Sequence, residues 1–293
     1  MYRSFPKLFK GNGAFVECRS SEAPRCILSM AAFNERLKEL NPKLSIYRTS
    51  NDSVQVYCRP SYGQKSIHKE AAKATDAGIN AKISEFLPQI ARRIFTEEFI
   101  AAQDSKKFFS AIRTLFYLSI CIQDTEGEVR IHDLFTGAER AAIWEEINKH
   151  RYALYGASTR WGDAILGDGA NLLNEIVRDA DELIAATNNE EQPRTAFLRF
   201  GHDYTVIATL AAMQVVGKSA RVDEFDTLKN EWVDFLITPM AANLQWIFYR
   251  NNHGDVLVKL LHNEQECRLP IDCPTAPYYP WERVRTLFRK QID

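Results

Sequence analysis

The fold is decided by the stretch Thr195-Ala196-Phe197-Leu198-Arg199-Phe200-Gly201-His202-Asp203-Tyr204, which continues from Thr205 to Met213. Its first six residues form a short apolar run that predicts a β-strand, Gly201 interrupts the run, and the residues from Asp203 onward predict a helix. His202 and Asp203 therefore lie between the carboxyl end of a strand and the amino end of a helix. Ligands of open α/β sheets bind at that edge, and the free N–H groups of a helix start attract anions. This position suits phosphate chemistry.

The same two residues also have a purely structural interpretation. Aspartate is among the strongest N-caps of helices, and a histidine beside a buried strand is often only a hydrogen-bonded polar group. The dipeptide alone leaves both interpretations open.

Composition restricts the partners of the 293-residue chain. Its formal net charge is −1, so no overall field attracts nucleic acid or an acidic membrane, and a polyanion has to be held by a local cluster of Arg and Lys. No run approaches eighteen apolar residues, which predicts no transmembrane helix. The first residues contain no apolar core of a signal peptide. We therefore expect neither nucleic acid nor a membrane as a partner, and the residues do not reveal the compartment.

The cysteines and most histidines give no sign of a metal site or a disulfide scaffold. The six cysteines form no C-x-x-C and have no zinc spacing with histidine. Cys267 and Cys273 can meet across a loop, but their pairing stays open at this stage. The other five histidines are scattered, and we interpret each as structural or solvated; they are His68, His132, His150, His253 and His262.

The remaining chain predicts an α/β frame around a helical insertion. Residues 14–18 and 44–48 are expected strands, and residues 24–40 an intervening helix that Ser20 or Ser21 can cap. Strand–helix–strand at this spacing favours a parallel sheet. Nearer the carboxyl end we expect a hairpin and a closing helix; the ranges are 241–249, 255–261 and 281–290.

Helical periodicity dominates from about residue 64 to residue 186. The prediction is therefore an α/β domain made of residues 1–63 and 187–293, with residues 64–186 as an inserted helical subdomain. An aromatic-rich loop at residues 155–162 either lines a site or packs onto its own domain.

Arg19 follows the first predicted strand, as His202 and Asp203 follow the later one. If the two strands are neighbours, their ends converge on one crevice. Arginine binds phosphate through bidentate, charge-assisted hydrogen bonds. A histidine donor can stabilise charge on phosphoryl oxygens, and a carboxylic acid can protonate a leaving alcohol. The alternative for Arg19 is a simple surface arginine.

Two segments together resemble the histidine acid phosphatases. Residues 15–21 with residues 25–33 resemble the R-S-T strand–helix segment of that family, and residues 199–203 resemble its carboxy-terminal H-D motif. Softer similarities point to the bacterial branch that dephosphorylates inositol polyphosphates, phytate included; they lie at residues 131–136, 155–158 and 171–181. The resemblance extends over most of the chain.

This resemblance implies a branch-two histidine phosphatase with a phosphoglycerate-mutase-like α/β sheet domain, an inserted helical cap subdomain and no metal or other cofactor. It implies hydrolysis of phosphate monoesters, inositol polyphosphates such as phytate among them, through a phosphohistidine. By position, Arg19 matches a phosphate-binding arginine, His202 the second histidine of the pocket and a phosphate ligand, and Asp203 the proton donor. A periplasmic or secreted location is implied by the resemblance alone.

The departure from the family lies in its nucleophile motif, R-H-G-x-R-x-P. The chain contains no Arg-His dipeptide, and it opens on residues that resemble the end of a helix. We therefore expect a chain truncated at its amino end, which lacks the nucleophile and the first strand of the sheet and is nearly inactive. Two further hypotheses stay open: a non-catalytic module that binds phosphate or inositol phosphate, and a scaffold in which Asp203 only caps a helix.

Overall fold

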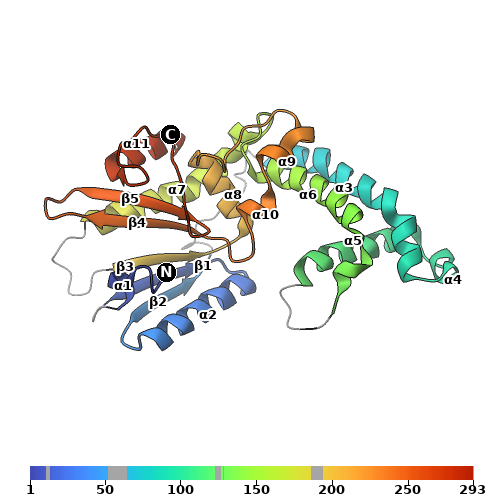
Figure 1. Ribbon diagram of the computed structural model, residues 1–293, viewed down its shortest axis with the longest axis horizontal. Coiled ribbons are helices and arrows are strands. Elements are labelled where there is room, and N and C mark those ends of the chain that lie inside the picture. The colour runs from blue at the N-terminus through green and yellow to red at the C-terminus, as the bar shows by residue number, and fades with distance from the viewer. Residues whose placement is uncertain (11–13, 52–64, 123–126, 128, 186–193, 293) are drawn as a thin grey trace.

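The computed structural model describes residues 1–10, 14–51, 65–122, 127, 129–185 and 194–292. Its first sheet is parallel and three-stranded, in the order β2-β1-β3. The strands are β1 (Phe15–Ser20), β2 (Ser45–Ser50) and β3 (Arg194–Phe200), and α2 (Pro24–Leu40) connects the first two. The predicted strand–helix–strand unit is confirmed, and with it an α/β fold with a parallel sheet (Figure 1).

The pairing of β1 with β3 brings two distant parts of the chain to one edge of this sheet. Arg19 is the register partner of Arg199, and Ser20 is the partner of Phe200. The contact continues past the strands, because the backbone N–H of Ser21 donates to the carbonyl of Phe200 at 3.1 Å. The predicted convergence of the two strand ends is therefore confirmed.

The two faces of this sheet differ in chemistry. Val16 and Cys18 are fully buried, and they pack with Leu37 of α2 and with Phe9 of the short helix α1 (Pro6–Phe9). Alternate residues of a strand point to opposite faces, so Glu17 and Arg19 lie on the other face. That face is covered by α7 (Gly162–Ala185), whose Asp179 pairs with Arg199 of β3.

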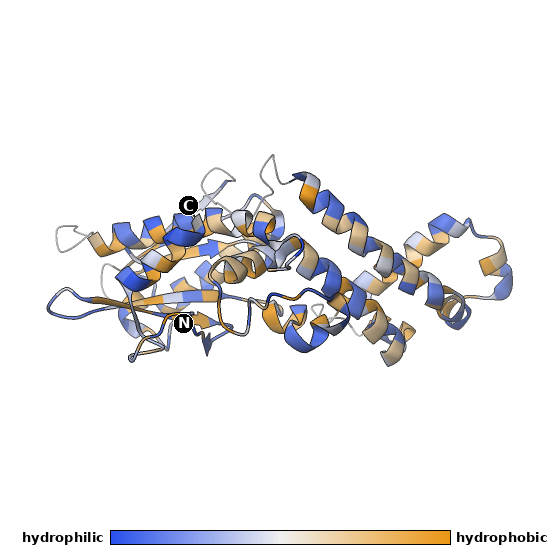
Figure 2. Cartoon of the chain, turned by 90° about the horizontal axis from the view of Figure 1, so that it is seen from above, coloured by the Kyte–Doolittle hydropathy of each residue, from blue (hydrophilic) through white to orange (hydrophobic). Residues whose placement is uncertain are grey.

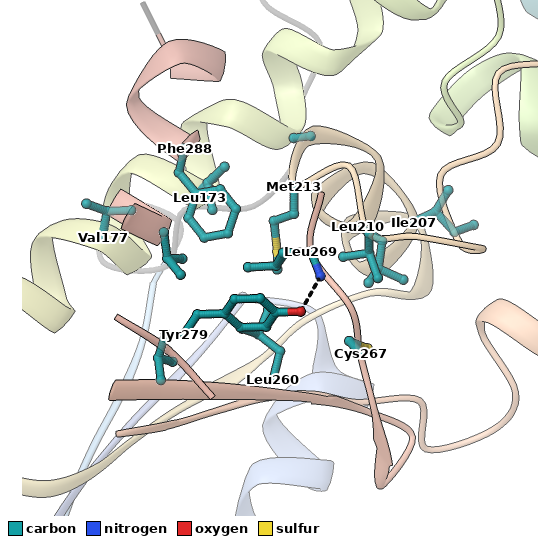
Figure 3. Packing of buried hydrophobic residues seen from close by; sticks show 14 of the residues in the cluster. Leu173, Val177, Ile207, Leu210, Met213, Leu260, Cys267, Leu269, Tyr279 and Phe288 are labelled. Atoms are coloured by element: carbon teal, nitrogen blue, oxygen red, sulfur yellow. Dashed lines mark hydrogen bonds between the residues drawn. The ribbon is translucent and has the colours of Figure 1, made fainter. Parts of the chain in front are cut away.

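A second sheet is antiparallel and carries the largest core. Its strands are β4 (Leu244–Arg250), β5 (Val256–His262), β6 (Gln265–Glu266) and β7 (Tyr279–Pro280). The predicted hairpin is β4 with β5, and the predicted closing helix is α11 (Trp281–Ile292). Figure 3 shows Tyr279 in this core, where its hydroxyl accepts a hydrogen bond from the N–H of Leu269 at 3.2 Å.

The core in Figure 3 also includes residues of α7. Leu173 and Val177 of α7 pack with residues of α8 (Asp203–Ala212), of β5 and of α11. Each of these neighbours belongs to the α/β part of the chain. Helix α7 thus shares this core.

The helices that extend away from the sheets are α3 (Lys65–Ile94), α4 (Glu97–Ala101), α5 (Ser105–Cys121) and α6 (Gly137–Tyr155). They have their own core, in which Ile83, Ile112 and Ile143 are fully buried. In Figures 1 and 2 these helices form an arm to one side of the sheets. The shorter described elements are η2 (Ile131–Leu134), η3 (Phe225–Thr227), α9 (Leu228–Glu231) and α10 (Asp234–Ile237).

Within the described residues, β3 and β4 each have a hydrogen-bonded neighbour on one side only. None of the described helices combines the length and the apolar character that a membrane crossing requires.

Candidate functional site

His202 lies at the convergence of β1 and β3, beside the start of α2. Its Nε2 is 3.3 Å from the hydroxyl oxygen of Ser21, and its Nδ1 is 3.0 Å from Nη2 of Arg25. The thiol of Cys26 donates to the carbonyl of Gly201 at 3.1 Å, which ties the first turn of α2 to the loop of His202. A histidine, a guanidinium and a hydroxyl thus share one position at the sheet edge.

The prediction that Ser20 or Ser21 caps α2 is wrong. The N-cap is Ala23, and no side chain accepts a hydrogen bond from the first turn. The Ser20 hydroxyl instead donates to the carbonyl of Ser21 at 2.7 Å. Because Pro24 begins the helix without an N–H, the cap is less needed, and Ser21 is left to face the imidazole.

One face of the His202 ring is covered by an aromatic side chain. The Tyr204 ring stacks on the imidazole with centroids 4.9 Å apart and planes 8° from parallel. Tyr155, at the end of α6, stacks in turn on Tyr204 at 5.2 Å. The aromatic loop at residues 155–162 has both of the predicted roles. Tyr155 joins this stack, and Trp161 is buried in a core of its own domain.

Asp203 is not the N-cap of α8. The N-cap of α8 is His202, and Asp203 is the first helical residue. One of its oxygens accepts from the N–H of Tyr204 at 2.8 Å, and the other accepts from Nη2 of Arg151 on α6. Burial raises the pKa of this carboxyl, but the Arg151 cation and the hydrogen bonds outweigh burial, so its pKa lies below the usual value for aspartate.

Arg151 is shared between two carboxylates. Besides Asp203 it pairs with Asp234, whose Oδ2 lies 3.3 Å from Nε of the guanidinium. Asp234 is itself held by Trp144, whose indole N–H donates to Oδ1 at 2.9 Å. The helical arm therefore contributes Arg151 and Tyr155 to the position where the two strands end.

Arg19 lies on the face of the sheet beneath α7. Its guanidinium pairs with Glu17 at 2.9 Å and lies over the ring of Phe197, 4.4 Å from the centroid. Arg194 also pairs with Glu17, at 2.8 Å, and Arg199 also lies over Phe197. The Arg19 side chain is 18% exposed, so it is not the freely solvated surface arginine of the alternative interpretation.

Two of the five other histidines are hydrogen-bonded within the fold. His150 bonds to the Thr75 hydroxyl at 2.8 Å and His262 to the carbonyl of Ile237 at 2.7 Å, which confirms a structural role for both. Cys267 and Cys273 are both free thiols. Among the residues that the structure describes, no three His, Cys, Asp or Glu side chains cluster as metal ligands.

Two hollows of the described surface lie elsewhere. One, of about 290 Å³, is lined by Glu70, Arg160 and Trp161, and the other, of about 380 Å³, lies beside β2 and is lined by Lys38 and Lys43. Neither includes His202.

The sequence predictions missed Arg25, Arg151 and Asp234. Arg25 carried a usable signal, because it stands in the first turn of a helix that follows a strand end, where anions bind. Arg151 carried none, because it is an ordinary polar residue of a long helix until the tertiary fold brings α6 to α8.

The fold is similar to that of solved phosphatases and phytases. The chain resembles the multiple inositol polyphosphate phosphatase of Bifidobacterium longum in complex with inositol hexasulfate, with a TM-score of 0.75, 18% identity and coverage of 98% of this chain and 76% of that one. It resembles the phytase of D. castellii with a TM-score of 0.67, 15% identity and coverage of 99% and 61%. For the phytase of Klebsiella sp ASR1 the values are 0.53, 12%, 100% and 81%.

The family model for the histidine phosphatase superfamily (branch 2) matches residues 1–263, and the chain therefore belongs to that superfamily. The resemblance found in the strand–helix segment and in the H-D motif is thereby confirmed. No sequence among curated proteins matches the chain.

Proposed function

We propose that this chain binds the phosphate group of a phosphate monoester at the carboxyl ends of β1 and β3, with His202 and Arg25 as ligands and Asp203 as the acid for the leaving alcohol. The contact of Arg25 with His202 at 3.0 Å carries the proposal, because it gathers hydrogen-bond donors where a helix also begins. Membership of the superfamily supports phosphate as the ligand.

Inositol polyphosphates are the substrate class that we propose. The support is the likeness to the B. longum enzyme, which has been solved with inositol hexasulfate and with phosphate. The second guanidinium near the site, that of Arg151, also suits a ligand with several phosphate groups.

Arg19 retains its proposed role as a phosphate ligand, and it competes with Arg25 for that role. Glu17 occupies the Arg19 guanidinium in this structure, whereas Nη2 of Arg25 lies at the His202 ring. The two arginines are therefore separable by mutation.

The test is calorimetric binding of inorganic phosphate and of myo-inositol hexakisphosphate. Arg25→Ala and His202→Ala should each weaken binding about ten- to a hundredfold, the loss of one charge-assisted hydrogen bond. Arg36→Ala is the control, because that arginine lies on the same helix but is exposed and paired with Glu39. If Arg19→Ala weakens binding and Arg25→Ala does not, the phosphate ligand is Arg19.

A non-catalytic phosphate-binding module is the second candidate. It is favoured by one observation, the absence of an Arg-His dipeptide from all 293 residues. Covalent catalysis through a phosphohistidine requires that nucleophile. We expect this chain to bind a phosphate monoester without hydrolysing it. Hydrolysis that is lost in His202→Ala would overturn the view that the chain lacks a nucleophile.

The proposed organisation is a phosphoglycerate-mutase-like α/β domain with a helical cap and without the first strand of its sheet. Among the described residues β3 has a hydrogen-bonded neighbour on one side only, so a further strand could pair at that edge. The apolar contacts of α7 with α8 favour a cap that ends before α7.

A further inference from the structure

Arg151 occupies an unusual position between two carboxylates from two other helices. It projects from α6, its Nη2 donates to Asp203 at the start of α8, and its Nε lies 3.3 Å from Asp234 at the start of α10. One cation thus serves two anions.

The two carboxylates are not equivalent. Oδ1 of Asp234 accepts from the Trp144 indole at 2.9 Å and from the N–H of Phe235 at 2.8 Å, and its side chain is 13% exposed. The Asp203 side chain is 49% exposed. Asp234 is therefore the fixed negative charge beside the guanidinium, and Asp203, which accepts the Nη2 hydrogen bond, is the partner that an incoming group can replace.

The groups around Asp203 oppose its use as an acid in the free site. Arg151 reaches it from α6, and the neighbouring His202 contacts Arg25 of α2 at 3.0 Å. Asp234, the other carboxylate on Arg151, shares that single positive charge with Asp203. A carboxyl that is to protonate a leaving alcohol must first hold a proton, and the ion pair with Arg151 disfavours that.

We propose that Arg151 is a positioning residue that holds Asp203 as a carboxylate in the free site and releases it when an anionic ligand takes the guanidinium, so that anion binding is coupled to the uptake of one proton by Asp203. This inference rests on the proposed function, because the ligand is the phosphorylated substrate. The proton comes from solvent, and no bond other than O–H forms at Asp203.

The electrostatics favour this exchange. A phosphate or sulfate group offers the planar guanidinium the bidentate geometry that it also uses with a carboxylate. Once the Nη groups of Arg151 face the ligand, Asp203 loses its hydrogen bond from the guanidinium and gains a neighbouring negative charge, and both changes favour its protonated form. The Asp234 charge stays beside Arg151 throughout.

The experiment uses inositol hexasulfate, whose sulfate groups stay ionised in mild acid, so that every proton taken up belongs to the protein. Binding is measured by calorimetry near pH 4 in two buffers of different ionisation enthalpy. In parallel, the carboxyl carbon of Asp203 is followed by NMR in protein labelled at aspartate, with Asp203→Asn for assignment.

The expected results are specific to Asp203. Wild-type protein should take up protons on binding, and Asp203→Asn should lose this uptake. The NMR midpoint of Asp203 should rise by at least about one pH unit when the ligand is saturating. Arg151→Met should show the raised midpoint already in the free protein, and Arg151→Lys, which keeps a charge, should lie between the two.

Arg113→Met is the matched control, because Arg113 pairs with Asp76 at 2.8 Å with similar exposure but between α5 and α3. It should leave the Asp203 midpoint unchanged. Binding of inositol hexasulfate without a change in that midpoint overturns the coupling and leaves the proposed function standing. No binding by wild-type protein overturns both. An Arg151→Met midpoint equal to that of wild type overturns the role of Arg151.

Discussion

The ion pair between Arg199 and Asp179 fastens β3 to α7, and its removal gives the sharpest test of the fold. The two side chains are only 12% and 7% exposed. Burial lowers the pKa of Arg199, and the Asp179 carboxylate counteracts that shift. Asp179→Leu leaves the guanidinium in place without its main partner.

The expected cost follows from this burial. Removing one partner of a buried ion pair typically costs about 3–5 kcal/mol. Two neighbours soften the loss here, since Glu175 lies 4.0 Å from the same guanidinium and the Phe197 ring lies 5.0 Å from it. We therefore expect the lower end, about 3 kcal/mol, which is a large part of the roughly 5–15 kcal/mol that stabilises a typical domain.

The assay is urea unfolding followed by circular dichroism. The double variant Asp179→Leu with Arg199→Met removes both charges and should be more stable than Asp179→Leu alone, because no uncompensated charge remains. Arg36→Met, which breaks an exposed pair with Glu39, is the control and should cost less than about 0.5 kcal/mol. A cost below about 1 kcal/mol for Asp179→Leu, or no recovery in the double variant, would refute the reasoning.

The remaining predictions concern packing, pH and thiol chemistry. Gly169→Ala should lower the free energy of unfolding in urea by about 1–3 kcal/mol, because its Cβ would lie 2.3 Å from a backbone oxygen of α8. Gly78→Ala should be near neutral or stabilising, because its Cβ would meet only the end of a flexible side chain. Burial lowers the pKa of His262, so the native state resists its protonation, and the free energy of unfolding should fall as the pH drops below about 6.5; His262→Gln should flatten this dependence, and an unchanged slope would contradict it. Burial raises the pKa of Cys18 to about 11, whereas the hydrogen bond to Thr275 lowers the pKa of the half-buried Cys273, so at pH 8 a thiol reagent should modify Cys273 before Cys18, and Cys18 only after unfolding, as read by mass spectrometry.

Local patterns predicted the elements of the fold well. The helix expected at residues 24–40 is α2 with the same bounds, and the run at residues 195–200 is β3 with one residue more. The hairpin and the closing helix are also present. These segments carry strong periodicity between clear turn residues, so their structure is decided by neighbours in the chain.

The sequence predicted the place of the site better than its contacts. Strand ends and a helix start indicated His202, and the pairing of β1 with β3 was a matter of topology. The partner of Asp203 was beyond reach, since Arg151 lies 52 residues away on a helix of the arm. The capping roles expected of Ser21 and Asp203 differ from the structure in two ways: Ser21 faces His202 instead of the first turn of α2, and Asp203 binds the N–H of Tyr204 from the first helical position rather than from the N-cap.

The stack of Tyr155, Tyr204 and His202 has a consequence for observation. A ring lying parallel to the imidazole, with centroids 4.9 Å apart, places the carbon-bound protons of His202 in the shielding region of the tyrosine ring current. Their resonances should therefore lie upfield of those of an exposed histidine such as His253. Because Tyr155 belongs to α6 and Tyr204 to α8, a displacement of the helical arm from the sheets would separate the two tyrosine rings and change the resonances of the Tyr204 ring protons. The protein thus carries a natural spectroscopic reporter of the contact between the arm and the sheets, located on the tyrosine beside His202.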